Sequence, residues 1–202
     1  MTTPTESTPA VSVTKIPLPR TGSEPTYVVM SPVATKILAV LRMLLGFVFL
    51  WAFLDKAFGW GYATPATRAW VNGGSPTKGF LTTVDAGPFA DTYHSWAGAP
   101  WADWLFMTGL LGIGVALIAG VAMRIAAATG SLLLLMMYAA EWPLAKLTAA
   151  GKPTSSTNPL VDDHIVFALL LAVLAIVYAG RTWGFGKRWA KVPFVRDHRW
   201  LL

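Results

Sequence analysis

The chain has 202 residues, of which 54% are hydrophobic and only 13% are charged, a balance that argues against a soluble protein and indicates a membrane protein. It contains no cysteine, which excludes disulfides, thiolate catalysis, iron–sulfur clusters and c-type haem attachment. The net charge of +6 does not indicate a nucleic-acid partner, because the basic residues lie at the ends of apolar segments, where lipid headgroups are the expected partners.

Residues 1–31 are rich in Thr, Pro and Ser and contain no apolar run, so we expect a flexible cytoplasmic tail. A helix is predicted to begin at Ser31-Pro32, because Ser is a good N-cap and Pro suits the first helical position. The apolar run that follows ends at Asp55-Lys56. Its roughly 18 residues nearly match a hydrocarbon core of about 30 Å, which predicts a first membrane-spanning helix.

Arg42 is the one charged residue inside this apolar run. In one interpretation its side chain extends back to the inner membrane surface, as long basic side chains near helix ends commonly do. In the other it faces the interior of the bundle and holds an anionic partner. Its position near the inner end of the helix favours the first interpretation.

A loop of about 46 residues, from Ala57 to Ala102, follows the first span and is too long to be a simple connection. Thr64-Pro65, Ser75-Pro76 and Gly87-Pro88 resemble helix starts, and the segments between them are rich in Trp, Tyr and Phe. Such aromatic side chains prefer the headgroup region of a membrane. We therefore expect short helices that lie on the outer membrane surface.

A second helix is predicted over residues 101–122 and a third over residues 125–138, joined by a tight turn. Small residues recur at four-residue spacing on both helices, a pattern that lets two helices come close together. These residues are Gly112, Ala116 and Gly120 on the second helix and Ala126 and Gly130 on the third. We expect the two helices to form an antiparallel hairpin that packs through these faces.

A fourth helix is predicted over residues 158–179, with Asn158 as N-cap and Pro159 at the first position. Asp162 and Asp163 fall in its first turn, where acidic residues complement the positive end of the helix dipole. Residues 182–202 are basic and aromatic, and are too charged to cross a bilayer. We expect them to form a basic cytoplasmic tail.

Eleven of the sixteen basic residues precede or start the first span, or fall in the short turn or the C-terminal tail, and five fall in the two longer loops. The positive-inside rule then places both termini in the cytoplasm. The sequence therefore predicts a multi-pass plasma-membrane protein of the all-α class. Its expected architecture is a four-transmembrane-helix bundle over residues 32–181, with short interfacial helices in the first outer loop.

In this topology, ionisable groups from distant parts of the sequence meet at the outer ends of three helices. A Lys and a His beside carboxylates could bind an anion or pass protons to a bound quinone. They could equally form a clasp of ion pairs that fixes the bundle, an interpretation that we slightly favour. The candidate catalytic residues are Lys56, Asp55, His164 and Asp163, and the candidate substrate- or quinone-binding residues are Arg42, Glu141 and Asp162. No metal site is predicted, because the methionines are too dispersed for a copper site.

Three segments resemble the DoxX/DoxD family of four-helix membrane proteins. The first is the spacing of Arg42, Gly46, Phe49 and the Asp55-Lys56 ending. The others are GWGYATPATRAWVNGGSPTKGFL, which follows it, and NPLVDDHIVFALLLAVLAIVYAGRTWGFGKRW near the C-terminus. The resemblance covers about residues 32–190 and implies the four-helix fold.

The resemblance implies two classes of function. The family includes DoxD, the membrane subunit of a thiosulfate:quinone oxidoreductase, and DoxX proteins linked to respiratory complexes. The chain is thus expected to be a subunit in quinone-linked electron transfer, with a quinone as the one implied cofactor and none bound covalently. Alternatively it is an accessory subunit without chemistry of its own, packed against a cytochrome or oxidase complex. The expected partners are the lipid bilayer and a membrane partner subunit or respiratory complex.

Overall fold

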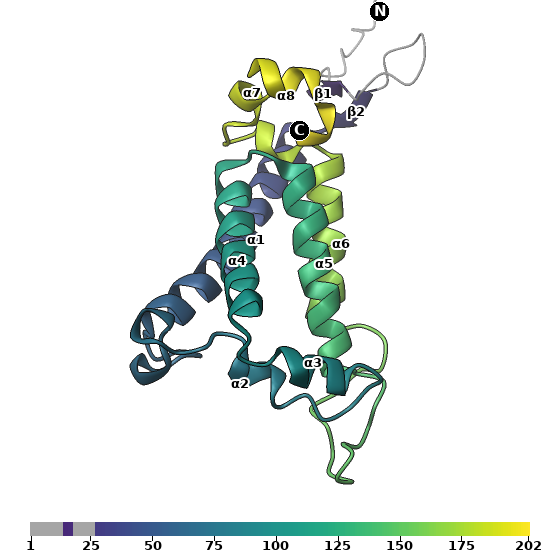
Figure 1. The fold of residues 1–202 in the computed structure, drawn as a ribbon. Coiled ribbons are helices and arrows are strands. Elements are labelled where there is room, and N and C mark those ends of the chain that lie inside the picture. The colour runs from purple at the N-terminus through teal and green to yellow at the C-terminus, as the bar shows by residue number, and fades with distance from the viewer. Residues whose placement is uncertain (1–13, 18–26) are drawn as a thin grey trace, which may run out of the picture.

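The computed structural model describes residues 14–17 and 27–202 (Figure 1), which are predominantly helical. Three helices are long and apolar enough to cross a membrane: α1 (Pro32–Phe58), α4 (Pro100–Ala119) and α5 (Met123–Glu141). A fourth apolar helix, α6 (Asp163–Ile176), has 14 residues and is about 21 Å long. The prediction of a helical membrane protein is confirmed.

Short elements cover both ends of the long helices. The first loop contains η1 (Ala66–Arg68), η2 (Trp70–Asn72), α2 (Lys78–Leu81) and α3 (Ala90–Trp96). After α6 come η3 (Ala179–Arg181), α7 (Gly186–Trp189), α8 (Pro193–Asp197) and η4 (Arg199–Leu201). We call the end that carries α2 and α3 the loop end, and the end that carries α7 and α8 the C-terminal end (Figure 1). The prediction of short helices in the first loop is confirmed.

Two parts of the segment predicted as a tail form an antiparallel strand pair. Strand β1 (Thr14–Pro17) pairs with β2 (Tyr27–Met30), with Thr14 opposite Met30. The pair lies at the C-terminal end of the helices (Figure 1). Residues 1–13 and 18–26 of the predicted tail lie outside the described residues.

The predicted helix starts are right for α1 and wrong for α6. Ser31 caps α1, and its hydroxyl accepts a hydrogen bond from the Ala34 N–H at 3.1 Å. Helix α6 begins at Asp163 rather than near Asn158, and its N-cap is Asp162, which accepts from the Ile165 N–H at 3.2 Å. The Asn158 side-chain oxygen instead accepts hydrogen bonds from the Leu160 and Val161 N–H groups, and so stabilises the turn before the helix.

The long helices pack as two pairs, α1 along α4 and α5 along α6, and these contacts are more extensive than those between α4 and α5. Leu45 and Phe49 of α1, Met107 and Leu117 of α4, and Leu171 of α6 are buried in one continuous hydrophobic core. Side chains that point away from this core are apolar and exposed along all four helices, as lipid-facing residues are. They include Val33, Ile37, Leu44, Phe47, Leu105, Val115, Leu132, Leu135, Val166, Leu169 and Ile176.

The close approach of α1 and α4 depends on two glycines. A Cβ atom at Gly46 would lie 2.9 Å from the Leu117 Cβ, and one at Gly114 would lie 2.7 Å from the backbone N of Leu50. Both distances are shorter than the van der Waals contact distance between non-bonded carbon or nitrogen atoms. A residue larger than glycine therefore does not fit at either position unless a helix moves. These glycines bring α4 close to α1, whereas the small residues in the sequence had predicted a close contact between α4 and α5.

The predicted small-residue face is therefore partly wrong. Gly112 is exposed, and a Cβ there would meet no described atom within 4 Å, because this side of α4 faces away from the bundle. Ala116 is half-buried against the core. Gly130 of α5 does mark a close contact, since a Cβ there would lie 2.7 Å from Leu171 of α6, whereas its nearest atom on α4 would be 3.4 Å away. Gly120 lies at the end of α4 and is described below.

We expect Gly114→Leu to lower the thermal unfolding midpoint of the detergent-solubilised protein, because the new side chain would collide with the α1 backbone. Overpacking of this kind costs about 1–3 kcal/mol. Gly112→Leu is the matched control: it adds the same side chain to the same helix where space is open, and its midpoint should stay close to that of the parent protein. Equal midpoints for both variants would show that α4 does not approach α1 through Gly114.

The C-terminal segment, predicted as a tail, is folded onto the ends of the helices. Val195 is 1% exposed and Leu201 is 7% exposed. The Trp189 indole N–H donates to the Leu201 carbonyl at 2.7 Å, and the Arg124 N–H donates to the Leu202 carbonyl at 3.1 Å. The apolar residues among the basic ones, which alone would not specify a fold, bury themselves against the bundle.

Candidate functional site

The ionisable residues singled out in the sequence lie in three separate places. Arg42 lies at the C-terminal end of the bundle, where it contacts the last turn of α4. Asp55 and Lys56 lie at the other end of α1. Glu141 and His164 meet between the end of α5 and the start of α6. Arg42 thus lies at the end of the bundle opposite Glu141 and Asp162, as its place near the start of the first helix predicted.

Arg42 is completely buried and is held by four backbone carbonyls. Its Nη1 donates to the carbonyls of Leu117 and Ile118, the latter at 2.8 Å. Its Nη2 donates to the carbonyls of Trp183 at 3.0 Å and Thr182 at 3.4 Å. One guanidinium thus joins α1 to the end of α4 and to the segment after η3. Neither the snorkelling interpretation nor the anion-binding one describes this contact.

The position of Arg42 follows from the carbonyls that a helix end leaves without partners. The last four carbonyls of α4 all have donors. Arg42 donates to two of them, those of Leu117 and Ile118. The Gly120 N–H donates to the Ala116 carbonyl at 2.8 Å, and the Phe185 N–H donates to the Ala119 carbonyl at 2.8 Å. The partial negative charge of a helix C-terminus also favours a cation there. Arg42 therefore acts as a C-terminal cap supplied by another helix.

Glycines surround the Arg42 guanidinium because larger residues would displace it. A Cβ at Gly184 would lie 3.2 Å from Nη2, and one at Gly120 would lie 3.0 Å from Nη1. Gly120 and Gly180 also pack backbone against backbone, since a Cβ at Gly120 would lie 2.8 Å from the Gly180 Cα. We call Arg42 and these three glycines the arginine clasp.

Asp55 is used to fasten the first loop. It is 1% exposed, and its two carboxylate oxygens accept hydrogen bonds from the Tyr62 N–H at 3.3 Å and the Ala63 N–H at 3.0 Å. Gly59 ends α1 with φ at +67° and turns the chain back toward this carboxylate. Both oxygens of Asp55 are thus engaged by backbone, which leaves this predicted catalytic residue with a structural role.

Lys56 is half-buried and lies with its Nζ 6.0 Å from the centre of the Phe106 ring on α4. Among the described residues no ion pair joins it to Glu141, Asp162 or Asp163. The loop-end half of α1 diverges from α5 and α6 (Figure 1), which explains why the predicted convergence does not occur. The prediction of a Lys56 clasp with these carboxylates is wrong.

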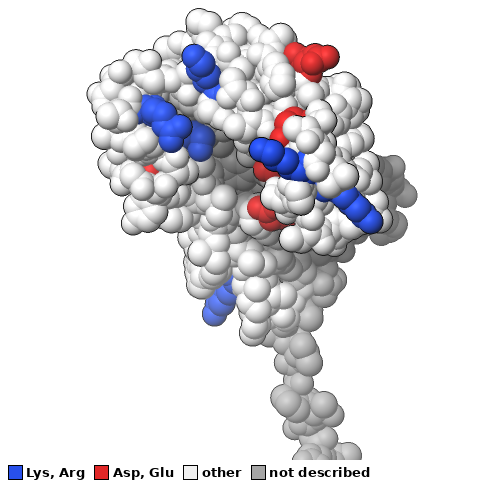
Figure 2. All heavy atoms as spheres, turned by 90° about the horizontal axis from the view of Figure 1, so that it is seen from below, with Lys and Arg blue, Asp and Glu red and all other residues white. Residues whose placement is uncertain are grey.

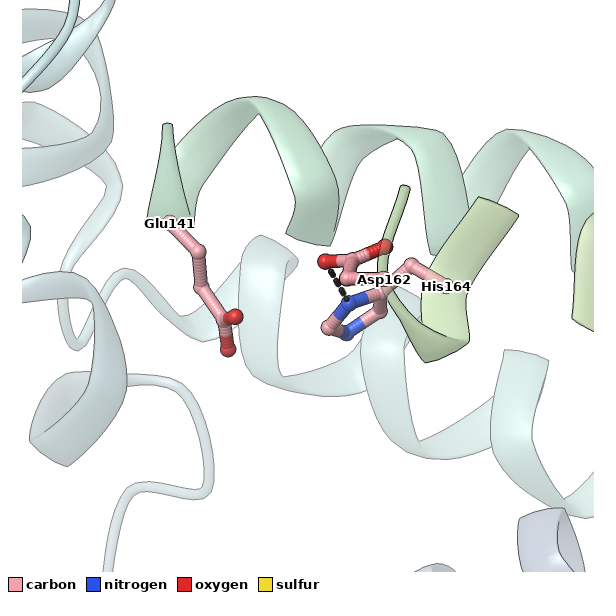
Figure 3. Close-up of side chains that lie close together, drawn as sticks. All are labelled: Glu141, Asp162 and His164. Atoms are coloured by element: carbon pink, nitrogen blue, oxygen red, sulfur yellow. Dashed lines mark hydrogen bonds and ion pairs between the residues drawn. The ribbon is translucent and has the colours of Figure 1, made fainter. Parts of the chain in front are cut away.

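Glu141, Asp162 and His164, which we call the His164 cluster, are brought together by the pairing of α5 with α6 (Figure 3). Glu141 is the last residue of α5, and Trp142 after it takes a left-handed conformation with φ at +41°, which ends the helix. Asp162 caps α6, and His164 is its second residue. Two helix ends, separated by an irregular loop, thus carry all three side chains to one place.

Within the cluster His164 is the buried member, and Asp162 orients it. The His164 Nδ1 lies 3.0 Å from the Asp162 Oδ2 and 3.7 Å from the Asp163 Oδ1. The His164 side chain is 9% exposed and that of Asp163 is 72% exposed. In Figure 3 the Glu141 carboxylate lies near the imidazole ring, beyond the Asp162 carboxylate. An imidazole held in this way can transfer protons or serve as a metal ligand.

The charge around His164 is unbalanced. Three carboxylates, those of Glu141, Asp162 and Asp163, lie near one imidazole, and no ion pair to a Lys or Arg is formed by any of them in the part of the chain that the structure describes. On the loop end as a whole, basic and acidic side chains both gather around a central hollow (Figure 2). The uncompensated negative charge is therefore local to the cluster.

Two further polar contacts in the loop region were not anticipated from the sequence. Asp103, buried in the first turn of α4, accepts from the Thr77 N–H at 2.9 Å, from the Thr77 hydroxyl at 2.6 Å and from the Ser75 hydroxyl at 2.9 Å. Tyr93 of α3 donates to the Met136 carbonyl of α5 at 2.8 Å, and burial raises the pKa of its phenol, which stays protonated. No local sequence signal indicates the first contact, because Thr77 and Asp103 are 26 positions apart.

No family model, curated protein or solved structure matches this chain.

Proposed function

We propose that this protein is a four-span membrane subunit of the DoxX/DoxD type that serves as an accessory or assembly subunit of a respiratory complex. The observation that supports the accessory role is that the most buried charged side chains form hydrogen bonds within the chain. Arg42 and Asp55 are the two charged residues buried most completely, and the two Nη atoms of Arg42 and both carboxylate oxygens of Asp55 form hydrogen bonds with the chain's own backbone. A substrate site in this part of the chain would instead leave such groups directed at open space.

The resemblance to DoxX/DoxD proteins supports the respiratory partner, and the exposed apolar faces of the long helices supply surface for lipid or a neighbouring subunit. For the fourth span, α6 is short, but it packs along α5 and continues into Val177 and η3. A bundle accommodates a short apolar helix by local thinning of the bilayer. Four spans leave both ends of the chain on the cytoplasmic side, as the distribution of basic residues favours.

The topology has a direct test, because the natural chain lacks cysteine. Single cysteines at the exposed positions Thr67, Ser155 and Lys187 should report their sides in intact cells. A membrane-impermeant maleimide is expected to label the first two and to spare Lys187→Cys until the membrane is permeabilised. Labelling of position 187 in intact cells would contradict four spans with cytoplasmic termini.

The accessory role predicts what loss of the protein does to a respiratory complex. Deleting the gene should reduce the amount of one assembled cytochrome or oxidase complex on native gels, while the activity per assembled complex stays unchanged. Expression of the parent protein in the deletion strain should restore assembly. Normal levels of all respiratory complexes in the deletion strain would contradict the proposal.

A second candidate function, a subunit of a quinone-reducing enzyme, is favoured by one observation: His164 is buried beside three carboxylates at the end of the bundle. Such a group could pass protons as a quinone is reduced. His164→Gln keeps a hydrogen-bonding side chain but cannot titrate near neutral pH. Thiosulfate-dependent quinone reduction in membranes that is lost in His164→Gln, with normal amounts of protein, would favour this second function over the accessory role.

A further inference from the structure

We infer that the His164 cluster is a binding site for a divalent metal cation, with Zn²⁺ as the best-fitting ion. Glu141, Asp162 and His164 each supply one ligand, and water completes the coordination. This inference goes beyond the proposed function and does not rest on it, because an accessory subunit and an enzyme subunit could each carry such a site.

The spacing of the ligand atoms carries the first part of the inference. One ligand atom from each of Glu141, Asp162 and His164 lies within 4.8 Å of the other two. Ligands about 2.0–2.2 Å from one zinc ion are separated by about 3.0–3.5 Å from one another. The His164 Nδ1 and the Asp162 Oδ2, 3.0 Å apart, already have this spacing. Glu141 is exposed at the end of α5, so rotation of its side chain can bring its carboxylate closer.

The burial of His164 is a second, independent observation. Its side chain is nine-tenths buried, and its Nδ1 faces the Asp162 Oδ2 at 3.0 Å. The carboxylates of Asp162 and Glu141 both lie near the ring (Figure 3). Burial already fixes the conformation of the imidazole side chain, so binding an ion costs little further side-chain entropy. A bound ion would take the place of the proton in the hydrogen bond between the His164 Nδ1 and the Asp162 carboxylate.

The charge balance favours a divalent ion over a proton. A protonated His164 would place one positive charge among the carboxylates of Glu141, Asp162 and Asp163, which leaves two negative charges uncompensated. A neutral His164 that binds a divalent ion leaves only one, on an exposed Asp163 that water can solvate. A metal ion therefore neutralises more of the local charge than protonation of His164 does.

The chemistry of the three ligand atoms favours one kind of metal ion. Imidazole nitrogen and carboxylate oxygen are both ligands of Zn²⁺, which in open sites takes three protein ligands and a water, whereas Ca²⁺ and Mg²⁺ prefer oxygen ligands alone. The chain has no cysteine, so the thiolate ligands preferred by softer metals are missing. The second oxygen of Asp162 accepts from the Ile165 N–H at 3.2 Å, which holds the first one in place.

The test uses the full-length protein in detergent, stripped with a chelator and titrated with Zn²⁺ by calorimetry. We expect one Zn²⁺ per chain, and at least tenfold weaker binding for both Glu141→Gln and His164→Gln, the usual effect of losing a group at a metal site. Asp91→Asn, which removes an exposed carboxylate of α3 at the same end of the bundle, is the control and should bind as tightly as the parent protein.

Two further readouts keep the result unambiguous. Co²⁺ in place of Zn²⁺ should give a visible absorption spectrum that changes in His164→Gln, which reports nitrogen ligation directly. The exposed Glu141→Gln change should leave the unfolding midpoint in chelator unaltered, so weaker binding there cannot reflect misfolding. Less than half an equivalent of bound Zn²⁺, or equal affinity in all four proteins, would mean adventitious surface binding only and would overturn the inference.

Discussion

Replacing Arg42 with Met is expected to lower the free energy of unfolding in detergent by about 2–4 kcal/mol, the larger of the two main effects that the structure predicts. The Ile118 and Trp183 carbonyls would lose their hydrogen bonds, and a buried carbonyl without a partner costs about 1–3 kcal/mol. Removing a buried charge returns part of this cost, because the guanidinium no longer has to be desolvated. The measurement is a denaturant titration of the purified protein.

Arg42→Lys is the matched variant, since it keeps the charge but not the planar fork. A single ammonium cannot reach carbonyls on both sides of the arginine clasp, so Lys should restore less than half of the lost stability. If Arg42 instead bound an anionic substrate, both variants would fold with normal stability and lose only activity. Normal unfolding midpoints for Arg42→Met would therefore contradict its structural role.

Replacing Gly180 with Ala is expected to be the second large effect, at about 2–3 kcal/mol, although it adds only one methyl group. The new Cβ would overlap the Gly120 carbonyl, and backbone atoms cannot move aside as a flexible side chain can. The segment after η3 would have to shift away from α4 and draw its carbonyls away from Arg42. Thermal unfolding followed by circular dichroism measures the loss.

Gly109→Ala is the control for this change. A Cβ at Gly109 meets no described atom within 4 Å, and within a helix Ala is more stable than Gly by about 1 kcal/mol. This variant should match or slightly exceed the parent protein in stability. A Gly180→Ala protein as stable as Gly109→Ala would show that the two backbones are not in contact at Gly120.

The helices could be predicted from the sequence because their signals are local. Apolar length predicted the three long helices, and Ser31-Pro32 predicted the start of α1, since capping depends on residues three positions apart. The start of α6 was wrong for the same reason: Asn158 and Asp162 are both good caps, and the choice between them depends on how the loop packs. The four-residue spacing of small residues suggested a face of α4, but not which neighbour it meets.

The candidate site could be predicted only in part, because its contacts join distant segments. The proximity of Glu141 to Asp162 and His164 followed from helix ends on one side of the bundle, and the structure brings these three together. The contacts of Arg42 were not predicted because its partners are backbone carbonyls 75 to 141 positions away, and every residue type has a backbone carbonyl. Lys56 was misassigned because the divergence of α1 depends on packing against α4.

The mass of the intact assembly, measured by native mass spectrometry after mild detergent extraction, tests the proposed accessory role most directly. The expected result is this 21.8 kDa chain bound to cytochrome or oxidase subunits, in a complex that also forms with the His164→Gln protein. The accessory role would be contradicted if the chain were found alone. It would also be contradicted if the chain were bound to one small partner and this complex reduced quinone with thiosulfate.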